Sequence, residues 1–475
     1  MNPITSPDSG LATLLAVQRK AFAAEGAPGA EERRADLGAL NDLLIKNRRA
    51  IIKACREDFG ARSAHETEIA EIATTLHTVR FARRHVARWM KPRRRKTGIW
   101  FLPAANRVVP QPKGGVGLMV PFNFPVNLSL GPLTSALAAG NRVMIKTSEF
   151  TPATGELLAR LLADRFPAEK VVALGGEMEV SQEFASLPFD HLLFTGSTAV
   201  GRHVMRAAAE NLTPVTLELG GKSPVIVGDD YPLARAAQRI VWGKLVNAGQ
   251  ICIAPDYVLV PEGKEREFAA LASAAARKFY PKLAGNDDYT AVINDGHYQR
   301  LTAAVEDARA KGAVIETAAD PDASRAERKL PLTIVLDPTD DMRVSQEEIF
   351  GPVLPVRGYR SVDEAIGYVN DRPRPLALYV FTENRSTQDR VLEETTSGGV
   401  SVNDTLMHYM QDDMPFGGVG PSGTGVYHSR EGFDTFSHLK PVFRQASLGP
   451  FTGAQLLYPP YGPVTRTLLR LMRKI

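Results

Sequence analysis

Few side chains in this 475-residue protein are suited to covalent chemistry, and the chain contains only two cysteines, Cys55 and Cys252. Cys252 lies in the stretch GQICIAP, where Gly249 permits close approach of the backbone and Gln250 adds a polar neighbour. A thiol with an ordinary pKa near 8.5 is roughly 3% ionised at pH 7, but the thiolate is a strong nucleophile. A modest local lowering of the pKa would therefore activate Cys252. An isolated cysteine is more often a small buried apolar residue, so its polar neighbours favour the catalytic interpretation.

A single carboxylate interrupts the apolar run LELGGKSP (217–224), where Glu218 precedes two glycines. Glutamate is rarely buried without a partner, because removing its charge from water is costly. Burial would raise the pKa of Glu218 and make it a candidate general base. The alternative is an exposed face of an edge strand, or a salt bridge.

Asn123 lies in the stretch PFNFP (121–125), between two prolines that restrict the backbone on either side. An amide held in this way can donate an N–H to a developing oxyanion, which is worth about 2.7 to 4 kcal/mol in a comparable site. The alternative is a turn-forming asparagine.

The run FTGSTAVG (194–201) predicts a strand end, a glycine turn and the start of a helix. Its glycines, Gly196 and Gly201, have a G-x4-G spacing that differs from the GxGxxG fingerprint. Free N–H groups at a helix N-terminus nevertheless favour a diphosphate, to which Ser197 can add a hydroxyl group.

One predicted strand earlier, RVMIKTSE (142–149) places Lys146 and Glu149 just past the end of a β run. Open α/β sheets bind ligands at the carboxyl ends of their strands. The carboxylate suits ribose hydroxyls, and the lysine suits the same hydroxyls or a phosphate. Otherwise both side chains are simply solvated.

The elements that would position these residues follow a clear order. Apolar residues recur three and four apart from about residue 10 to 90, which predicts helices, and strands then alternate with helices, which predicts an α/β fold with parallel sheets. The order is clearest between 142 and 205, a doubly wound unit with the following predicted elements: a strand at 143–145, a helix at 152–165, and strands at 171–174 and 192–194.

Composition limits the class of protein. Apolar residues make up 44% and charged residues 23%, which is typical of a soluble globular protein, and the length predicts two or three domains. A net charge of +4 suits an anionic ligand but does not indicate nucleic-acid binding. The cysteines lack zinc-ligand spacing, so we expect no metal. Two cysteines, no secretion signal and no long apolar run together predict a cytoplasmic protein.

Two segments are unusually basic. Residues 80–96 carry nine Lys or Arg, which we interpret as a solvated helix end leading into an edge strand. The last twelve residues form an amphipathic pattern that would either dock on the protein itself or make peripheral contact with an anionic membrane. Its apolar face is formed by Val464, Leu468, Met472 and Ile475.

Taken together, the motifs resemble those of the aldehyde dehydrogenase superfamily over about residues 10 to 445. They are, in order, PFNFP, KTSE, FTGSTAVG, LELGGKSP, NAGQICIAPDYV, EEIFGP and PFGGVGPSGTGVYHSREGFDTFSH. The fifth and the end of the last are similar to the class 3 branch, which contains fatty, aromatic and coniferyl aldehyde dehydrogenases. The resemblance implies NAD(P)-dependent oxidation of an aldehyde to a carboxylic acid.

The resemblance also implies roles for individual residues. Cys252 would attack the aldehyde, the Asn123 amide and the Cys252 N–H would hold the oxyanion, and Glu218 would activate the water that hydrolyses the thioester. Glu348 and Phe350 of EEIFGP match positions that hold the nicotinamide ribose and ring. Lys146 and Glu149 match adenosine-ribose contacts, and the turn beside the diphosphate is matched by Gly196, Ser197 and Gly201.

The domain organisation that follows from the resemblance has three parts and a tail. A Rossmann-like cofactor domain would comprise residues 1–90 and 111–219, and an α/β catalytic domain residues 220–404. A β oligomerisation arm at 91–110 and 405–445 would form a homodimer, and residues 446–475 would be a C-terminal tail. The tail lacks the long apolar anchor of membrane-bound fatty aldehyde dehydrogenases.

Two alternative functions remain at this point. An acylating enzyme would pass the thioester to coenzyme A, but a thiol acceptor does not need the base Glu218. A non-catalytic binding protein would not need Cys252, Glu218 and Asn123 together.

Substrate and cofactor are predicted less directly. Met407, Tyr409, Met410 and Met414 indicate either an apolar entrance, for medium or long aliphatic, aromatic or coniferyl-type aldehydes, or ordinary core and dimer contacts. Because Glu149 would repel a 2′-phosphate, we predict NAD as the main cofactor, with NADP tolerated.

Overall fold

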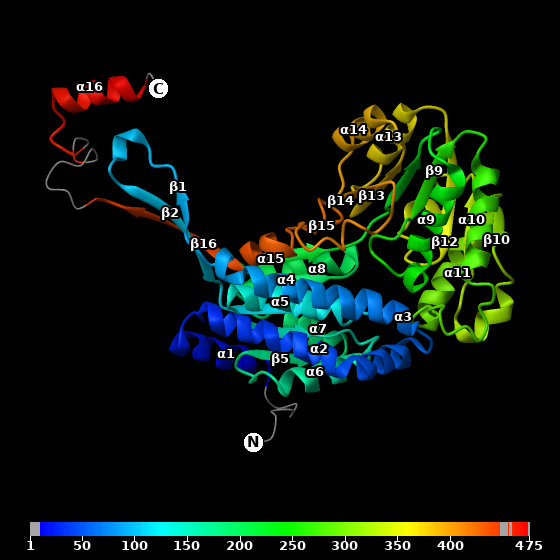
Figure 1. Ribbon diagram of the computed structural model, residues 1–475, viewed down its shortest axis with the longest axis horizontal. Helices are drawn as coiled ribbons and strands as arrows, with labels where there is room; N and C mark the ends of the chain where they lie inside the picture. The colour runs from blue at the N-terminus through cyan, green and yellow to red at the C-terminus, as the bar shows by residue number, and fades with distance from the viewer. Residues whose placement is uncertain (1–9, 447–454, 456–457, 474–475) are drawn as a thin grey trace.

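The computed structural model describes residues 10–446, 455 and 458–473, which form three sheets with their covering helices (Figure 1). The first sheet has six strands in the order β15-β7-β6-β3-β4-β5, all parallel except β15. Its central strands are fully buried, which explains their nearly continuous apolar sequences. The strands are β3 (Gly115–Met119), β4 (Arg142–Lys146), β5 (Val171–Leu174), β6 (His191–Thr195), β7 (Val215–Glu218) and β15 (Gly423–Thr424).

The strand order of this sheet reverses next to β3. The chain runs from β3 outward through β4 to β5 and then returns to β6 on the other side of β3. The carboxyl ends of β3 and β6 therefore flank a topological switch point, where open α/β sheets bind their ligands.

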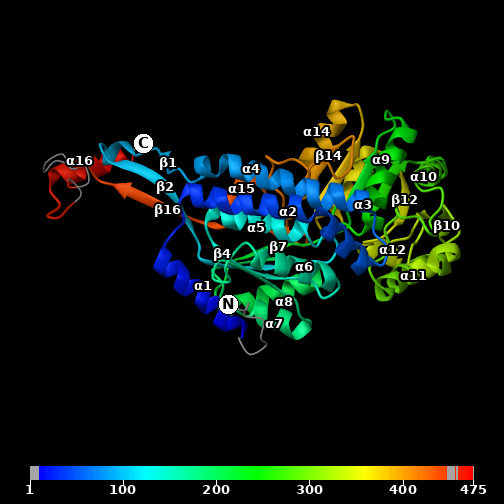
Figure 2. The same ribbon diagram turned by 60° about the horizontal axis from the view of Figure 1, so that its bottom comes forward.

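Helices cover both faces of the six-stranded sheet, with α2, α4 and α5 on one side and α1, α7 and α8 on the other (Figure 2). The first group packs together around α2 and α5, and α6 also contacts α2. The bounds are α1 (Leu11–Glu25), α2 (Ala30–Phe59), α3 (Ala64–Glu66), a π-helix η1 (Thr67–Ala73), α4 (Thr74–Trp89), α5 (Asn127–Ala139), α6 (Pro152–Ala163), α7 (Met178–Ala185) and α8 (Thr198–Ala209).

The second sheet has seven strands in the order β10-β11-β12-β9-β8-β13-β14, with only the β10–β11 pair antiparallel. The strands are β8 (Pro224–Val227), β9 (Tyr257–Pro261), β10 (Val314–Thr317), β11 (Thr333–Leu336), β12 (Val353–Tyr359), β13 (Ala377–Phe381) and β14 (Gly399–Val402). The intervening helical elements are α9 (Leu233–Leu245), η3 (Val246–Gly249), α10 (Glu265–Phe279), α11 (Asp295–Ala310), η4 (Asp322–Glu327), α12 (Arg343–Gln346), α13 (Val362–Asn370) and α14 (Arg385–Glu394).

The third sheet is a three-stranded antiparallel arm that projects from the rest of the molecule (Figure 1). It consists of β1 (Arg93–Arg95), β2 (Ala105–Pro112) and β16 (Ser437–Arg444), with a short 3-10 helix η2 (Ile99–Phe101) between the first two strands. The C-terminal helix α16 (Pro463–Met472) lies beside the far end of the arm (Figure 1). Ile475, which we placed on the apolar face of this helix, lies outside the described residues.

The structure confirms the predicted fold class and most of the predicted elements. Residues 10–90 are predominantly helical, and the predicted doubly wound unit appears as β4, α6, β5 and β6. The basic segment is the end of α4 followed by β1, which pairs only with β2 and is an edge strand. No helix among the described residues is long and apolar enough to cross a membrane.

The division into domains remains a prediction, and the arm is shorter than that division assumed. Within residues 405–445, the strand β15 joins the six-stranded sheet, and the helix α15 (Ser429–Thr435) packs on α5 and α4. Only β16 of this segment continues into the three-stranded sheet.

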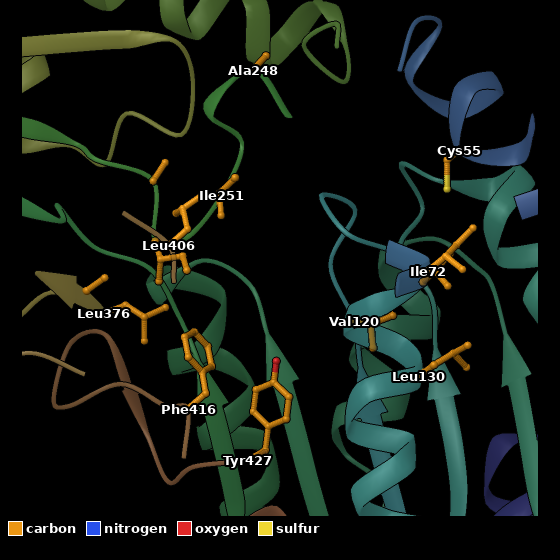
Figure 3. Packing of buried hydrophobic residues seen from close by; sticks show 14 of the residues in the cluster. Cys55, Ile72, Val120, Leu130, Ala248, Ile251, Leu376, Leu406, Phe416 and Tyr427 are labelled. Carbon is orange, nitrogen blue, oxygen red and sulfur yellow. The ribbon is translucent and has the colours of Figure 1, made fainter. Parts of the chain in front are cut away.

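One large cluster of buried apolar side chains connects the helical layer with the second sheet. Figure 3 shows Cys55, Ile72 and Leu130 on one side of this cluster, and Ile251 and Phe416 on the other. The fully buried Cys55 is part of this core, and burial raises the pKa of its thiol to about 12. Of the two cysteines, Cys55 is therefore a structural apolar residue.

Candidate active site

Cys252 follows a backbone turn that only particular residues can form. Asn247, Ala248 and Gly249 after helix α9 have φ angles of 52°, 52° and 73°, in the left-handed region that is strained for residues with a Cβ. A Cβ at Gly249 would lie 2.5 Å from the carbonyl oxygen of Gly351, so a side chain does not fit there. This turn carries the chain from α9 into the segment that ends at Cys252.

Cys252 and Glu218 line the same cavity, which has a volume of about 230 Å³. Glu218 reaches it as the last residue of β7. The rest of the lining is mostly apolar and includes five aromatic rings, those of Phe124, Trp242, Tyr409, Phe416 and Tyr427. Figure 3 shows Phe416 and Tyr427 next to each other, below Ile251 and Leu406. Of the four residues predicted at an apolar entrance, Met407, Tyr409 and Met410 line this cavity and Met414 does not.

Glu218 is buried without a partner. Its side chain is 2% exposed, and neither carboxyl oxygen has a hydrogen-bond partner among the described residues. Burial raises the pKa of the Glu218 carboxyl well above its usual range. The alternatives of an exposed strand face and of a salt bridge do not apply, and burial favours the neutral form of Glu218.

The pKa of Cys252 is raised rather than lowered. The main cause is burial of the thiol, and the carboxyl groups of Glu348 and Glu218 add to it. These surroundings stabilise the thiol, so this state of the protein does not supply the modest lowering of the pKa that would activate Cys252. Strongly perturbed groups that converge on one cavity are typical of a functional site.

Asn123 is joined to the cysteine segment by hydrogen bonds. Its Nδ2 donates to the carbonyl oxygen of Gln250 at 3.0 Å, and its own carbonyl oxygen accepts from Asn247 Nδ2, also at 3.0 Å. The side chain is 3% exposed. The two segments are more than 120 residues apart in sequence, and Asn123 holds them together rather than serving only as a turn former.

Four of the predicted cofactor residues, Lys146, Glu149, Gly196 and Ser197, lie at or just after the carboxyl ends of β4 and β6 in the six-stranded sheet. Lys146 ends β4, and its ammonium group lies 4.0 Å from Glu149 Oε2 and donates to the carbonyl oxygen of Thr147 at 2.7 Å. Burial lowers the pKa of Lys146. Ser197 caps the N-terminus of α8, where its hydroxyl oxygen accepts from Val200 N at 3.3 Å.

The two glycines of the turn differ in their surroundings. Gly196 directly follows β6, whereas Gly201 is buried inside α8, where a Cβ would lie 2.7 Å from Leu219 Cδ2. Gly201 thus allows α8 to pack closely on the chain that follows β7. Its contact with a cofactor remains a prediction.

Glu348 and Phe350 come from the chain just before β12. A Cβ at Gly220 would lie 2.3 Å from both carboxyl oxygens of Glu348, so this side chain is packed against the backbone two residues after Glu218. Burial, with a contribution from Asp256, raises the pKa of Glu348 to about 8. Phe350 has a φ of 47°, and its ring centroid lies 5.9 Å from that of Phe122.

These residues fit a nicotinamide dinucleotide. The buried ammonium group of Lys146 has three donor hydrogens, one hydrogen bond to Thr147 and one carboxylate neighbour, so it can still bind a ligand. The N-terminus of α8 offers N–H groups at the switch point, where a diphosphate is favoured. The described residues contain no group of three or more side chains that could hold a metal ion.

Several residues at the site were not predicted from sequence. Phe122, Phe150 and His297 form an aromatic cluster with Phe350, and their ring centroids are 5.2 to 6.0 Å apart. Phe122 and Phe350 lie inside the motifs PFNFP and EEIFGP, and Phe150 directly follows KTSE, which is the sequence signal for the cluster.

Charged residues beneath the Asn123 loop were missed as well. Arg62 and Glu71 are buried and Glu66 is half-buried, all in or beside α3 and the π-helix η1. The available sequence signal was a carboxylate at a helix position that faces the core. π-Helical turns occur frequently at functional sites.

The doubly wound sheet, the second α/β sheet and the cavity shared by a cysteine and a carboxyl group define a nicotinamide-dependent oxidoreductase. The chain belongs to the aldehyde dehydrogenase family, whose sequence profile matches residues 11–442. It is an enzyme that oxidises aldehydes with NAD(P), and its fold is the aldehyde dehydrogenase fold.

Individual relatives agree with this assignment. The chain is 55% identical to a "Probable coniferyl aldehyde dehydrogenase" of Pseudomonas aeruginosa over 97% of this chain and 95% of the relative. It resembles the solved substrate-bound state of Staphylococcus aureus AldH with a TM-score of 0.91, 36% identity, and coverage of 99% and 100% of the two chains. A point mutant of S. aureus betaine aldehyde dehydrogenase in complex with NAD⁺ matches with a TM-score of 0.83 and 26% identity over 92% and 89% of the chains.

Proposed function

We propose that the enzyme oxidises aromatic aldehydes of the coniferyl type through a covalent intermediate on Cys252. The observation that carries the proposal is that one apolar cavity contains both Cys252 and the unpartnered carboxyl group of Glu218. In the sequence of steps, Cys252 sulfur bonds to the aldehyde carbon and the carbonyl oxygen becomes an oxyanion. The Asn123 amide and the Cys252 N–H stabilise this oxyanion.

The second half of the reaction needs a hydride acceptor and a base. A nicotinamide held by Glu348 and Phe350 would supply the acceptor for the hydride on the former aldehyde carbon. Glu218 then takes a proton from a water molecule as the water attacks the resulting thioester, the carbon–sulfur bond breaks and Cys252 is released with the carboxylic acid. Because burial favours the neutral form of Glu218 and the thiol form of Cys252, both groups must lose a proton before they act.

The cofactor would be held by residues of both sheets. In our proposal Lys146 and Glu149 bind the adenosine ribose, the turn at Gly196, Ser197 and Gly201 lies beside the diphosphate, and Glu348 and Phe350 hold the nicotinamide ribose and ring. Glu149 is about one third exposed at the edge of the sheet, where its carboxylate would repel a 2′-phosphate. This supports NAD as the main cofactor, with NADP tolerated.

The apolar cavity supports the substrate class. Five aromatic rings and several aliphatic side chains line a volume of about 230 Å³, which suits a planar aromatic aldehyde better than an acidic one. The coniferyl-type ring follows from the name of the Pseudomonas relative at 55% identity. Medium and long aliphatic aldehydes are compatible with the same lining.

For the assembly, we propose a homodimer formed through the arm and a peripheral contact of the tail with anionic membranes. The arm exposes Ile99, Phe101, Leu102 and Phe443, which a partner subunit would cover. On α16, Val464, Leu469 and Leu471 are exposed beside Arg466 and Arg470, a pattern typical of helices that lie on membranes. A cytoplasmic location would fit two cysteines that are both unpaired.

The test is reduction of NAD and NADP by the purified enzyme on aliphatic, aromatic and acidic aldehydes. We expect the highest kcat/KM with NAD and coniferyl aldehyde, and loss of activity in Cys252→Ala. A Cys55→Ala variant is the matched control and should keep its activity, because Cys55 is buried in the core. Retained activity in Cys252→Ala would refute the covalent mechanism, and a requirement for coenzyme A would replace hydrolysis by acyl transfer.

A further inference from the structure

A completely buried ion pair beside the site joins Arg62 to Glu71. The distance from Arg62 Nη2 to Glu71 Oε1 is 3.0 Å, and both side chains are completely buried. Neither residue lines the cavity that contains Cys252. Burying a charged pair is costly in desolvation, so such a pair is a poor source of stability and a candidate for another role.

Both partners hold the loop that carries Asn123. Arg62 Nη1 donates to the backbone carbonyl oxygen of Asn123 at 3.0 Å. Glu71 Oε2 accepts from the backbone N–H groups of Val126 at 3.1 Å and Asn127 at 2.7 Å, at the start of α5. The pair thus fixes both the asparagine and the helix that follows it.

The guanidinium group of Arg62 also lies between two aromatic rings. Its central carbon is 4.4 Å from the ring centroid of Phe59 and 5.3 Å from that of Phe124, which directly follows Asn123. Arginine combines stacking with a planar fork of donors, and a lysine cannot reproduce this combination.

The carbonyl oxygen of Asn123 is shared with the cysteine segment. It accepts from Arg62 and from Asn247 Nδ2, while the Asn123 side chain donates to the carbonyl oxygen of Gln250. Displacing Arg62 would leave this oxygen with one partner and would free the loop to move relative to the segment that ends in Cys252.

We propose that Arg62, held by Glu71, is a positioning residue that sets the orientation of Asn123 for binding the oxyanion. The inference rests on the proposed role of Asn123. Because the oxyanion exists only after attack on the aldehyde, loss of this orientation weakens an interaction made after binding. The effect therefore appears in kcat, whereas KM for the aldehyde and for NAD stays nearly constant.

The test is a double-mutant cycle between Arg62→Lys and Asn123→Ala in the full-length enzyme. Arg62→Lys alone is expected to lower kcat about 10- to 100-fold, since it keeps the charge but loses the fork. In the Asn123→Ala background the same substitution should change kcat less than threefold. A purely structural Arg62 would give equal losses in both backgrounds, and that result would overturn the inference.

The matched control is Arg33→Lys. Arg33 is also buried, and its Nη1 donates at 2.9 Å to the carbonyl oxygen of Ala138, at the opposite end of the same helix α5. It should lower the melting temperature without lowering kcat by more than about twofold. An equal loss of kcat in Arg33→Lys would show that disturbance of α5 alone suffices, and it would refute positioning by Arg62.

Two further measurements keep the outcomes distinct. If Arg62→Lys does not fold, Glu71→Gln replaces it in the cycle, because the amide oxygen can still accept from Val126 and Asn127 while the ion pair is lost. If Asn123→Ala alone retains full activity, the proposed oxyanion role fails and the inference fails with it. If Asn123→Ala is impaired and the two losses simply add, only the inference fails.

Discussion

The carboxyl group of Glu348 lies directly against the α-carbon of Gly220, so that a Cβ at position 220 would approach both of its oxygens to 2.3 Å. This contact connects the glycine pair that follows Glu218 with the EEIFGP motif more than 120 residues later. A group proposed to hold the nicotinamide ribose is thereby placed close to the proposed base.

We expect Gly220→Ala to displace the Glu348 side chain and raise KM for NAD about tenfold, with a smaller effect on folding. Steady-state kinetics with varied NAD and circular dichroism would measure the two effects. Gly367→Ala is the control, since a Cβ at that helical position meets nothing within 4 Å. Unchanged KM for NAD in Gly220→Ala would contradict the proposed role of Glu348.

Glu218→Gln should separate the two halves of the reaction. The substitution keeps the volume of the side chain but removes the base, so one equivalent of NADH should form rapidly and turnover should then fall roughly 10²- to 10⁴-fold. Rapid-mixing absorbance would show the burst, and mass spectrometry of the quenched enzyme would show an acyl group on Cys252. If no burst is seen, the base acts before hydride transfer instead.

The stability of the cofactor-free enzyme should depend on Glu348. The folded state keeps this proton up to a pKa of about 8, whereas the unfolded chain releases it near 4.5. The favourable contribution is therefore present below about pH 4.5 and is lost as the pH rises through 8. Glu348→Gln removes this dependence. As the pH rises from 5 to 8, the melting temperature of the variant should therefore increase relative to that of the wild type. Substitution of its exposed neighbour, Glu347→Gln, should not change the melting temperature relative to the wild type in this way.

Two exposed methionines offer a test of the substrate cavity. Met410 and Met414 are 40% and 43% exposed, but only Met410 lines the cavity with Cys252. Met410→Ala should raise KM for an aromatic aldehyde roughly fivefold, which corresponds to about 1 kcal/mol of lost apolar contact. Met414→Ala should leave KM unchanged, and equal effects of the two substitutions would argue against this cavity as the substrate site.

The local order of elements was predictable because it depends on short-range patterns. Helical periodicity up to residue 90, and the strand, helix, strand order around Lys146 and Gly196, both agree with the structure. That Cys252 and Glu218 would share one cavity was implied by the family resemblance, because each residue lies in a motif that matches the family. Their roles remain proposals until the substitutions above are made.

Long-range contacts were not predictable from these patterns. The pKa of Cys252 depends on its burial and on Glu348, almost 100 residues away, and neither cause could be read from the residues beside the cysteine in the sequence. Likewise, Met414 resembled Met410 in sequence, yet the fold leaves it outside the cavity.

The α/β class, the family and the candidate reactive groups could be read from the amino-acid sequence, because they depend on periodicity and on ordered motifs. The behaviour of those groups depends on the three-dimensional packing around them. It buried Glu218 without a partner, raised the pKa of Cys252 and placed the Arg62–Glu71 pair beneath Asn123. The physical reason is that desolvation and hydrogen bonding act between residues that are close in space, whatever their separation along the chain.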